Sequence, residues 1–516
     1  MPTTDQIRIA QDRAEPRLMQ LWWALRPLTS VLRFMQTGAH PDDEISGMLA
    51  ALAFRDGINL SYACSTRGEG GQNDIGTEAG SDLGALRTRE MERACDVLGM
   101  RMYWHSTHPE DSITDFGFSK NGKETLNRWG RDRTLRRFVE ILRTEKPDIL
   151  CPTFLDVPGQ HGHHRAMTEA ALDAMAAAAD PAIRTSAPPW QVKKLYLPAW
   201  SGAGRSYDDD LPPPPATVII PGMDRELMTG WSWNRIGQQS RAYHRTQGMG
   251  RWEPAGGGQD WPLHLAETHV DGPDSAVWSG LPRTLADLAY QPGAEPMVAA
   301  LIAAQSQIDA ALAAFPNFAL IADNAAGAVT HIRDALAACS PAFRQNASHR
   351  LEAKLAQLGR VLRLSLGIEA HVRCDKTFIE AGDTTPYRIE VAPGDAHSVT
   401  ARLDLPEHWS HTAQRLAVSA QAAVTDPYRA AYDPLEPDLP RLSLCVTHAG
   451  TEVTVPMAFD AEPVVLPKDR VTLTPSSTVL NSTAPARTVE IQLLDVSAPD
   501  AGVELDAPAG WTTEKT

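Results

Sequence analysis

The sequence predicts an α/β fold: a Rossmann-like, mostly parallel sheet with helices on both faces, followed by a helical segment and a C-terminal β-sandwich. Between residues 31 and 200, short apolar runs alternate with segments of helical period, which is typical of parallel strands joined by crossover helices. Residues 296–366 are rich in Ala and Leu and have a helical pattern. After Gly367 short runs of period two alternate with Gly, Pro and Asp turns, as in β-sandwiches.

The elements of the first region follow from apolar runs and end signals. The first strand is the apolar run that begins Val31-Leu32-Arg33-Phe34-Met35. Gly57 and Gly99 stand where two helices should end, because glycine readily adopts the left-handed conformation of a C-cap. Pro147 can end the helix before the fourth strand. The predicted strands are 31–38, 58–65, 100–105, 148–154 and 193–198, and the predicted helices are 44–56, 78–98, 124–145 and 164–178.

Composition excludes several classes of protein. The formal charge is −16, from 48 Lys and Arg against 64 Asp and Glu, so nucleic acid and anionic membranes are not expected partners. No apolar run approaches the roughly 20 residues that cross a bilayer, so we expect no transmembrane segment. The polar N-terminus lacks a basic-then-apolar signal segment, which predicts a cytoplasmic protein. The six cysteines show no CxxC spacing, and we expect no disulfide framework.

The first chemical motif is His40-Pro41-Asp42-Asp43-Glu44, directly after the first predicted strand. In open α/β sheets, ligands bind at the edge where such turns lie. His40 and Asp43 are three residues apart at a tight turn, so both can face one point. Asp42 points elsewhere, and a carboxylate beside a metal and its water can act as general base. Glu44 should begin the next helix, where its charge suits the dipole. The alternative is a helix-capping cluster, but three acids beside a histidine exceed what capping requires.

The second motif is His161-Gly162-His163-His164, which follows the fourth strand and opens a helix. His161 and His164 lie on one helical face, so one can bind a metal while the other reaches a substrate. We expect His163 to point away, either behind the ligands or exposed. Alone, histidines in a glycine-containing loop would be ambiguous. Together the motifs offer two imidazoles and a carboxylate with a position left for water, the ligand pattern of catalytic zinc.

These motifs, with Thr66-Arg67-Gly68-Glu69-Gly70-Gly71 and Arg87-Thr88-Arg89-Glu90 between them, resemble the PIG-L/LmbE family of zinc-dependent de-N-acetylases. The resemblance covers roughly residues 30–250, and His244-Arg245-Thr246-Gln247 is a weaker late match. It implies His40, Asp43 and His164 as zinc ligands, and Asp42 as the general base that activates water. It also implies His161 as the cation that stabilises the oxyanion or protonates the leaving amine.

The chain departs from the family pattern at one place. Gly162 and His163 stand where many members have Pro and Asp. The acid that could orient His161 or His164 is therefore absent. Its role passes either to Asp156 or to no residue.

Three further residues are predicted to bind substrate: Arg87, Asp115 and Glu69. In the family the arginine faces the sugar, whereas the alternative here is an ion pair of Arg87 with Glu90. Glu69 lies in a glycine-rich loop, where backbone can approach a ligand closely. Asp115 either binds a sugar hydroxyl or is a simple turn residue. Tryptophans at 231, 233, 252 and 261 either pack a lobe, which we favour, or stack on sugar rings.

The resemblance implies a metal-dependent hydrolase that removes an N-acetyl group from an amino sugar or glycoconjugate. The cofactor is Zn²⁺, although a His₂Asp site also accepts iron, cobalt or manganese. The expected partner is an N-acetylated sugar. One alternative is an amidase that cleaves a sugar-linked conjugate, and another is a carbohydrate-binding protein with a vestigial metal site. The intact His/Asp set speaks against the second alternative.

Length predicts several domains, since about one domain per 150 residues gives about three. Only about 50 residues of the last β region are present, so we expect the chain to end inside a domain. The predicted division is a catalytic domain at 1–200, a Gly/Pro/Trp-rich lobe at 201–295 that completes the catalytic unit, a helical segment at 296–366, a β-sandwich at 367–465 and a partial β domain at 466–516.

Overall fold

A computed structural model of the chain describes residues 4–200, 209–254, 257–468, 470–474 and 489–494, and the single residues 502, 504, 510 and 512. The chain forms two units. The larger unit comprises Met1–Arg373, Arg388–Leu405 and Asp426–Asp460, and the smaller comprises Cys374–Tyr387, Pro406–Thr425 and Ala461–Thr516. The domain boundaries proposed from the sequence stay predictions.

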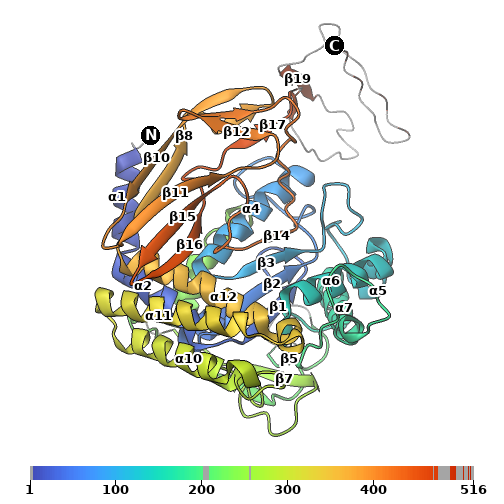
Figure 1. Cartoon of the computed structure of the whole chain (residues 1–516). Helices are drawn as coiled ribbons and strands as arrows, with labels where there is room; N and C mark the ends of the chain where they lie inside the picture. Colours follow the sequence, from blue (N-terminus) through green and yellow to red (C-terminus); the bar gives the residue numbers. More distant parts are fainter. Residues whose placement is uncertain are drawn as a thin grey trace. The chain divides into compact units, whose positions relative to one another are not determined.

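An eight-stranded sheet, in the order β14-β3-β2-β1-β4-β5-β7-β6, forms the centre of the larger unit (Figure 1). The five strands β1 to β5 pair in parallel, whereas β7, β6 and β14 join antiparallel. The predicted, largely parallel sheet is therefore confirmed, and the lobe adds two strands to it. The strands are β1 (Arg33–Gly38), β2 (Asn59–Cys64), β3 (Arg101–Trp104), β4 (Ile149–Pro152), β5 (Lys194–Pro198), β6 (Val218–Ile220), β7 (Trp261–Thr268) and β14 (Ala431–Tyr432).

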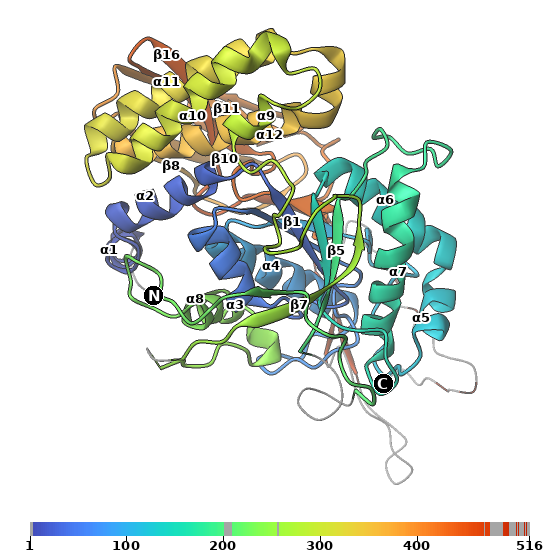
Figure 2. The ribbon, with the colours of Figure 1, turned by 90° about the horizontal axis from the view of Figure 1, so that it is seen from below.

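Helices cover both faces of this sheet (Figure 2). One apolar core holds Phe34, Tyr62 and Trp104 against α3, α4 and α8, and the other holds Met35 and Leu150 against α5, α6 and α7. The bounds on the first face are α3 (Ser46–Ala50), its π-helical continuation η2 (Ala51–Arg55), α4 (Ser81–Leu98), α8 (Trp233–Arg241) and the 3₁₀ turn η3 (Arg245–Gln247). On the second face they are α5 (Gly122–Trp129), α6 (Arg131–Glu145) and α7 (Gly162–Ala179).

Two predicted helices differ from the observed ones. The predicted helix 124–145 is two helices, because Gly130 between them has φ +85°, a conformation outside a right-handed helix. The predicted helix 44–56 begins only at Ser46. Glu44 therefore does not start the helix, and its side chain is fully buried instead.

The remaining helices of the larger unit pack around the N-terminal segment and a small antiparallel sheet. The helical segment expected at 296–366 is confirmed, and it consists of three helices that lie side by side (Figure 1). The N-terminal helices are α1 (Thr4–Ala14), α2 (Arg17–Leu25) and the 3₁₀ turn η1 (Arg26–Thr29). The later ones are α9 (Leu285–Leu288), the 3₁₀ turn η4 (Glu295–Met297), α10 (Val298–Ala313), α11 (Phe318–Ala337) and α12 (Pro341–Ser365). Strands β11 (Ser398–Asp404), β15 (Arg441–His448) and β16 (Thr451–Met457) pair antiparallel.

One segment of the described residues, Glu295–Ala313, is long and apolar enough to span a membrane, with a mean hydropathy of 1.2. A core helix meets the same criteria, and α10 within this segment packs along α11. The segment is therefore weak evidence for a membrane span.

The C-terminal strands are mostly antiparallel, but a sandwich arrangement is not confirmed. Strands β12 and β13 pair antiparallel, as do β13 and the first residues of β10, whereas β9 and β17 pair in parallel. The bounds are β8 (Glu369–Cys374), β9 (Phe378–Glu380), β10 (Thr384–Ala392), β12 (Trp409–Thr412), β13 (Arg415–Val418) and β17 (Val464–Leu466). Most of the predicted domain at 466–516 lies outside the described residues. Within it, β18 (Arg470–Thr474) pairs with β19 (Glu490–Leu494).

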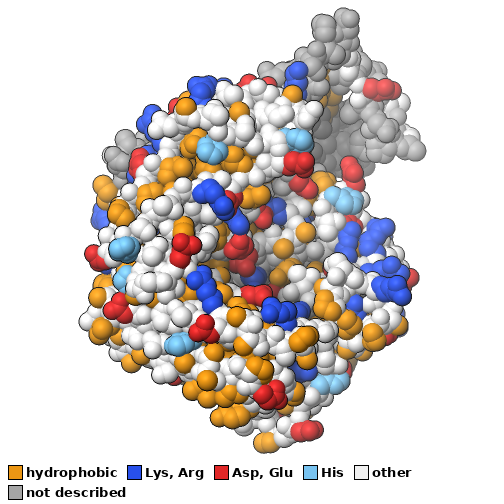
Figure 3. Space-filling model, viewed as in Figure 1, with side chains coloured by type: hydrophobic (Ala, Val, Ile, Leu, Met, Phe, Trp, Pro, Cys, Tyr) orange, Lys and Arg blue, Asp and Glu red, His pale blue; other side chains and the backbone are white. Residues whose placement is uncertain are grey.

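The surface charge is unevenly distributed. Lys and Arg gather over α5 and α6 (Figure 3), two helices whose basic side chains at the surface are Lys123, Arg128, Arg131, Arg133, Arg136 and Arg137. The strongly negative total charge therefore conceals a locally basic face.

A buried ion pair fastens α12 to the amino end of β4. Arg350 donates to both carboxylate oxygens of Asp148, at 2.8 and 2.6 Å, and to the carbonyl of Val31 at 2.8 Å. We expect Arg350→Met to lower the free energy of unfolding by about 3–5 kcal/mol, because it leaves a buried carboxylate without its cation. Denaturant unfolding followed by tryptophan fluorescence measures this. Arg344→Met, at an exposed position of the same helix, is the control, and equal effects of the two substitutions would contradict the prediction.

Candidate active site

The two histidine motifs meet because their strands are neighbours. β1 and β4 pair in parallel, with Phe34 opposite Ile149 and Thr37 opposite Pro152. The loops after the two strands therefore leave the same edge of the sheet. His40 to Glu44 follow β1, and His161 is the N-cap of α7, with His163 and His164 in its first turn. The glycine-rich loop after β2 and Asp115 after β3 reach the same edge.

His40, Asp43 and His164 form a compact group of possible metal ligands. The Nδ1 atom of His40 lies 3.2 Å from His164 Nε2 and 3.5 Å from Asp43 Oδ2, and His164 Nε2 lies 3.3 Å from Asp43 Oδ1. A tetrahedral zinc ion with bonds of roughly 2.0–2.1 Å sets neighbouring donor atoms roughly 3.3 Å apart. The two histidine nitrogens are therefore spaced as in a tetrahedral metal site, and each of them lies near a different oxygen of Asp43.

Hydrogen bonds and a ring contact orient the side chains of His164 and Asp43. His164 Nδ1 lies 2.8 Å from Gln160 Oε1, so Nδ1 carries the proton and Nε2 keeps its lone pair for a metal. The His164 ring stacks on Phe154 with centroids 4.0 Å apart. Asp43 Oδ2 accepts hydrogen bonds from the backbone N–H groups of Ala39 and His40, both at 2.9 Å. The sequence reasoning missed Gln160, and its position directly before the histidine motif is the signal that could have found it.

Of the two positions expected for His163, exposed or behind the ligands, the exposed one is wrong. Its side chain is fully buried, and its Nδ1 lies 3.4 Å from His161 Nε2. His40, His161 and His163 form a second group of possible ligands. Asp115, 3.7 Å from His40 Nε2 and 3.8 Å from His163 Nε2, lies beside this group. Asp156 pairs with Arg165 at 2.6 Å, so it does not orient His161.

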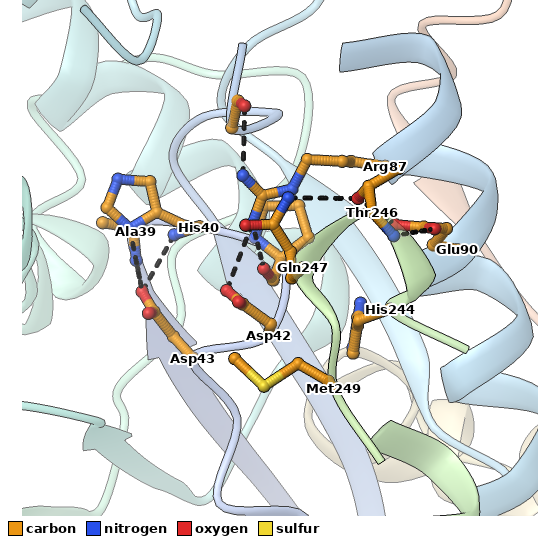
Figure 4. A network of polar contacts seen from close by, with 12 residues as sticks. Ala39, His40, Asp42, Asp43, Arg87, Glu90, His244, Thr246, Gln247 and Met249 are labelled. Carbon is orange, nitrogen blue, oxygen red and sulfur yellow. Dashed lines mark hydrogen bonds and ion pairs between the residues drawn. The ribbon is translucent and has the colours of Figure 1, made fainter. Parts of the chain in front are cut away.

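Asp42 is held in an unusual conformation beside the ligand group. It is a non-glycine residue with φ +98°. Its Oδ1 accepts a hydrogen bond from Arg87 Nη2 at 3.2 Å, and the same nitrogen donates to the Pro41 carbonyl at 2.6 Å (Figure 4). Burial raises the pKa of the Asp42 carboxyl, although the Arg87 charge opposes the shift.

The predicted substrate residues lie close together, but their role in binding stays a prediction. Arg87 is buried and contacts Gly68, Pro41 and Asp42 rather than Glu90. Glu90 instead accepts from the backbone N–H and hydroxyl of Thr246 (Figure 4). The ion-pair alternative is therefore wrong.

Glu69 and Asp115 are tied to each other. Glu69 Oε2 accepts from the backbone N–H groups of Arg67 and Asp115, both at 3.1 Å. The other oxygen, Oε1, is buried and has no hydrogen-bond partner among the described residues. Asp115 also accepts from the Gly117 N–H at 2.8 Å, as a turn residue does.

Residues far along the chain hold the glycine-rich loop. The fully buried guanidinium of Arg67 donates to the carbonyls of Ser106 and Arg429, both at 2.7 Å. It lies between the rings of Trp104 and Tyr428, with its central carbon 4.1 and 4.7 Å from their centroids. No sequence pattern pointed to the segment around Tyr428.

The charges of the group are strongly coupled. Burial lowers the pKa of His40, but the charges of Asp115 and Asp43 outweigh it and raise that pKa to about 9. Burial raises the pKa of Asp43, but His164 and His40 together hold it well below its usual value. Burial, helped by positive charge on His40 and His164, lowers the pKa of His161 to about 4. A metal ion in this group would have to displace the proton of His40.

The tryptophans of the lobe serve mainly in packing. Trp233 and Trp261 belong to the apolar core, and the partly buried Trp231 packs against that core. Trp252 is 79% exposed, and the Arg235 guanidinium lies over its ring.

The chain resembles known deacetylases in sequence. A family model described as GlcNAc-PI de-N-acetylase, PIG-L, matches residues 35–175. The 1D-myo-inositol 2-acetamido-2-deoxy-alpha-D-glucopyranoside deacetylase 2 of Saccharopolyspora erythraea is 32% identical over 192 residues, which is 34% of this chain and 68% of the relative. The corresponding deacetylase of Thermobifida fusca is 26% identical over 219 residues, covering 38% and 75%. The N,N'-diacetylchitobiose deacetylase of Pyrococcus horikoshii has 18% identity over 48% of this chain and 80% of that one, with a TM-score of 0.30, too low to bear on the fold.

Proposed function

Because this chain belongs to the PIG-L family of de-N-acetylases, we propose that it removes the N-acetyl group of an amino sugar or glycoconjugate by metal-assisted hydrolysis. Water and the acetamide give acetate and the free amine. The observation that supports this most directly is the cluster of His40, Asp43 and His164. Its two histidine nitrogens lie 3.2 Å apart, and each lies 3.3–3.5 Å from one of the Asp43 oxygens. Asp42, whose carboxylate pairs with Arg87 and is not in the ligand group, is the residue directly before Asp43.

These three side chains would hold a divalent metal, and zinc suits two imidazoles and one carboxylate. When bound, zinc supplies a Lewis acid for the acyl carbonyl and makes nearby water more acidic. Asp42 is proposed to take the proton from that water. Arg87 occupies Oδ1 of Asp42, and no described residue hydrogen-bonds Oδ2, which leaves that oxygen free to accept.

His161 is proposed to serve the leaving group. Its Nε2 lies 3.1 Å from the Gly117 carbonyl, which can only accept, so Nε2 carries a proton. The pKa of about 4 leaves this ring neutral near pH 7. His161 is therefore proposed to become a cation only during the reaction, by receiving the proton taken from water, and then to donate it to the departing nitrogen and stabilise the developing oxyanion. Arg87, Asp115 and Glu69 are proposed to bind the sugar.

An acetate-release assay on protein of measured metal content tests the proposal. We expect equal amounts of acetate and free amine from 1D-myo-inositol 2-acetamido-2-deoxy-alpha-D-glucopyranoside or N,N'-diacetylchitobiose. Chelator should abolish the release, and added Zn²⁺ should restore it. A larger acid as product would instead identify an amidase. Sugar binding without any product, at full metal content, would identify a binding protein and overturn the proposal.

A further inference from the structure

The backbone of Asp42 is strained. A non-glycine residue at φ +98° costs of order 1–3 kcal/mol and persists only where its surroundings hold it. Because Asp42 is the proposed general base, whatever holds this turn also sets where its carboxylate points.

Side chains bind both backbone groups of Asp42. The Asp42 N–H donates to Glu44 Oε2 at 3.0 Å. The Asp42 carbonyl accepts from Arg241 Nη1 at 2.9 Å, and the same nitrogen donates to the Glu44 carbonyl at 3.1 Å. The strained peptide is thus clamped from two sides.

Glu44 is fixed in turn by His244. His244 Nε2 lies 2.9 Å from Glu44 Oε1, and both side chains are completely buried. A buried carboxylate without this partner would pay a large desolvation cost. Close packing brings the lobe into reach, since a Cβ atom on Gly237 of α8 would come within 2.5 Å of the Gly47 nitrogen of α3.

We infer that Arg241 and His244 are positioning residues that hold the strained turn of Asp42, Arg241 directly and His244 through Glu44. The inference rests on the proposed function, and it gives the lobe a catalytic purpose beyond packing. Neither residue lies among the proposed ligands or substrate contacts. His244 stands just behind the turn, on the side of α8 and η3 (Figure 4).

The test compares His244→Gln with His244→Leu in the full chain. Glutamine can place an N–H near the position of Nε2, whereas leucine has similar bulk and no donor. We expect His244→Leu to lower kcat by about 10²-fold, as a misplacement of about 1 Å can do, with KM and metal content little changed. His244→Gln should recover most of the rate. His269→Leu, at an exposed histidine of the same lobe, should behave as wild type.

A double substitution separates positioning from general destabilisation. In the Asp42→Asn background, His244→Leu should cost little further rate, because residues that act through one group are not additive. Equal losses for the Gln and Leu variants, a fully additive double variant, or lost metal would overturn the inference.

Crystal structures give a readout that needs no activity. We expect Asp42 at positive φ in the wild type and relaxed to negative φ in His244→Leu. An unchanged Asp42 in that variant refutes the inference even if the rate falls. If the wild type hydrolyses no N-acetyl sugar, the proposed function fails, and this backbone comparison still decides whether His244 holds the turn.

Discussion

His164→Ala should strip the protein of its metal. The wild type, purified without added metal, should contain about one divalent ion per chain, as a site of three protein ligands does. The substitution removes one of the three metal ligands. Loss of a residue that only orients a ligand lowers metal affinity by about 10–100-fold, and we expect a larger loss here. Elemental analysis of the purified proteins measures this.

Two matched variants sharpen the result. Gln160→Leu leaves all three donors in place but removes the partner of His164 Nδ1, together with the Gln160 hydrogen bonds to the His161 N–H and to Asp209. We expect the smaller loss of about 10–100-fold. His163→Asn lies in the same helical turn but outside the His40, Asp43 and His164 group, and it should keep the metal. If His163→Asn loses metal while His164→Ala keeps it, the ligands are the second group, His40, His161 and His163.

Asp42→Asn should keep the metal and lose most of the turnover. The amide has the same shape but cannot take a proton, and a general base contributes roughly 10²–10⁴-fold in rate. Asparagine also tolerates positive φ better than most residues, so the turn should survive. Steady-state kinetics measure the loss of turnover, and metal analysis of the same sample measures whether the metal is kept.

Asp43→Asn is the matched control for Asp42→Asn, one residue away in the same loop. Asp43 contacts both His40 and His164, so its amide should weaken metal binding. If Asp42→Asn lost as much metal as Asp43→Asn, the assignment of Asp42 as base and Asp43 as ligand would be wrong.

The sequence by itself determined the parallel sheet and the meeting of its motifs. Alternating apolar runs indicate parallel strands, and parallel strands put every following loop at one edge. The His40–Glu44 and His161–His164 motifs could therefore be brought together without coordinates, because their loops follow β1 and β4. Spacing paired His40 with Asp43 and His161 with His164, but only the resemblance to the family implied which of these residues bind the metal and which one is the base.

Only the tertiary structure decided what surrounds those residues. Arg241 and His244 lie about 200 positions from Asp42 and Glu44, and Tyr428 lies farther still from Arg67. No period or spacing relates residues so far apart. The burial of Glu44 was missed for the same reason, and the position of His163 was left open between buried and exposed. A sequence pattern describes only the helix or loop to which a residue belongs. The burial of a side chain depends on which distant segment of the chain packs against it.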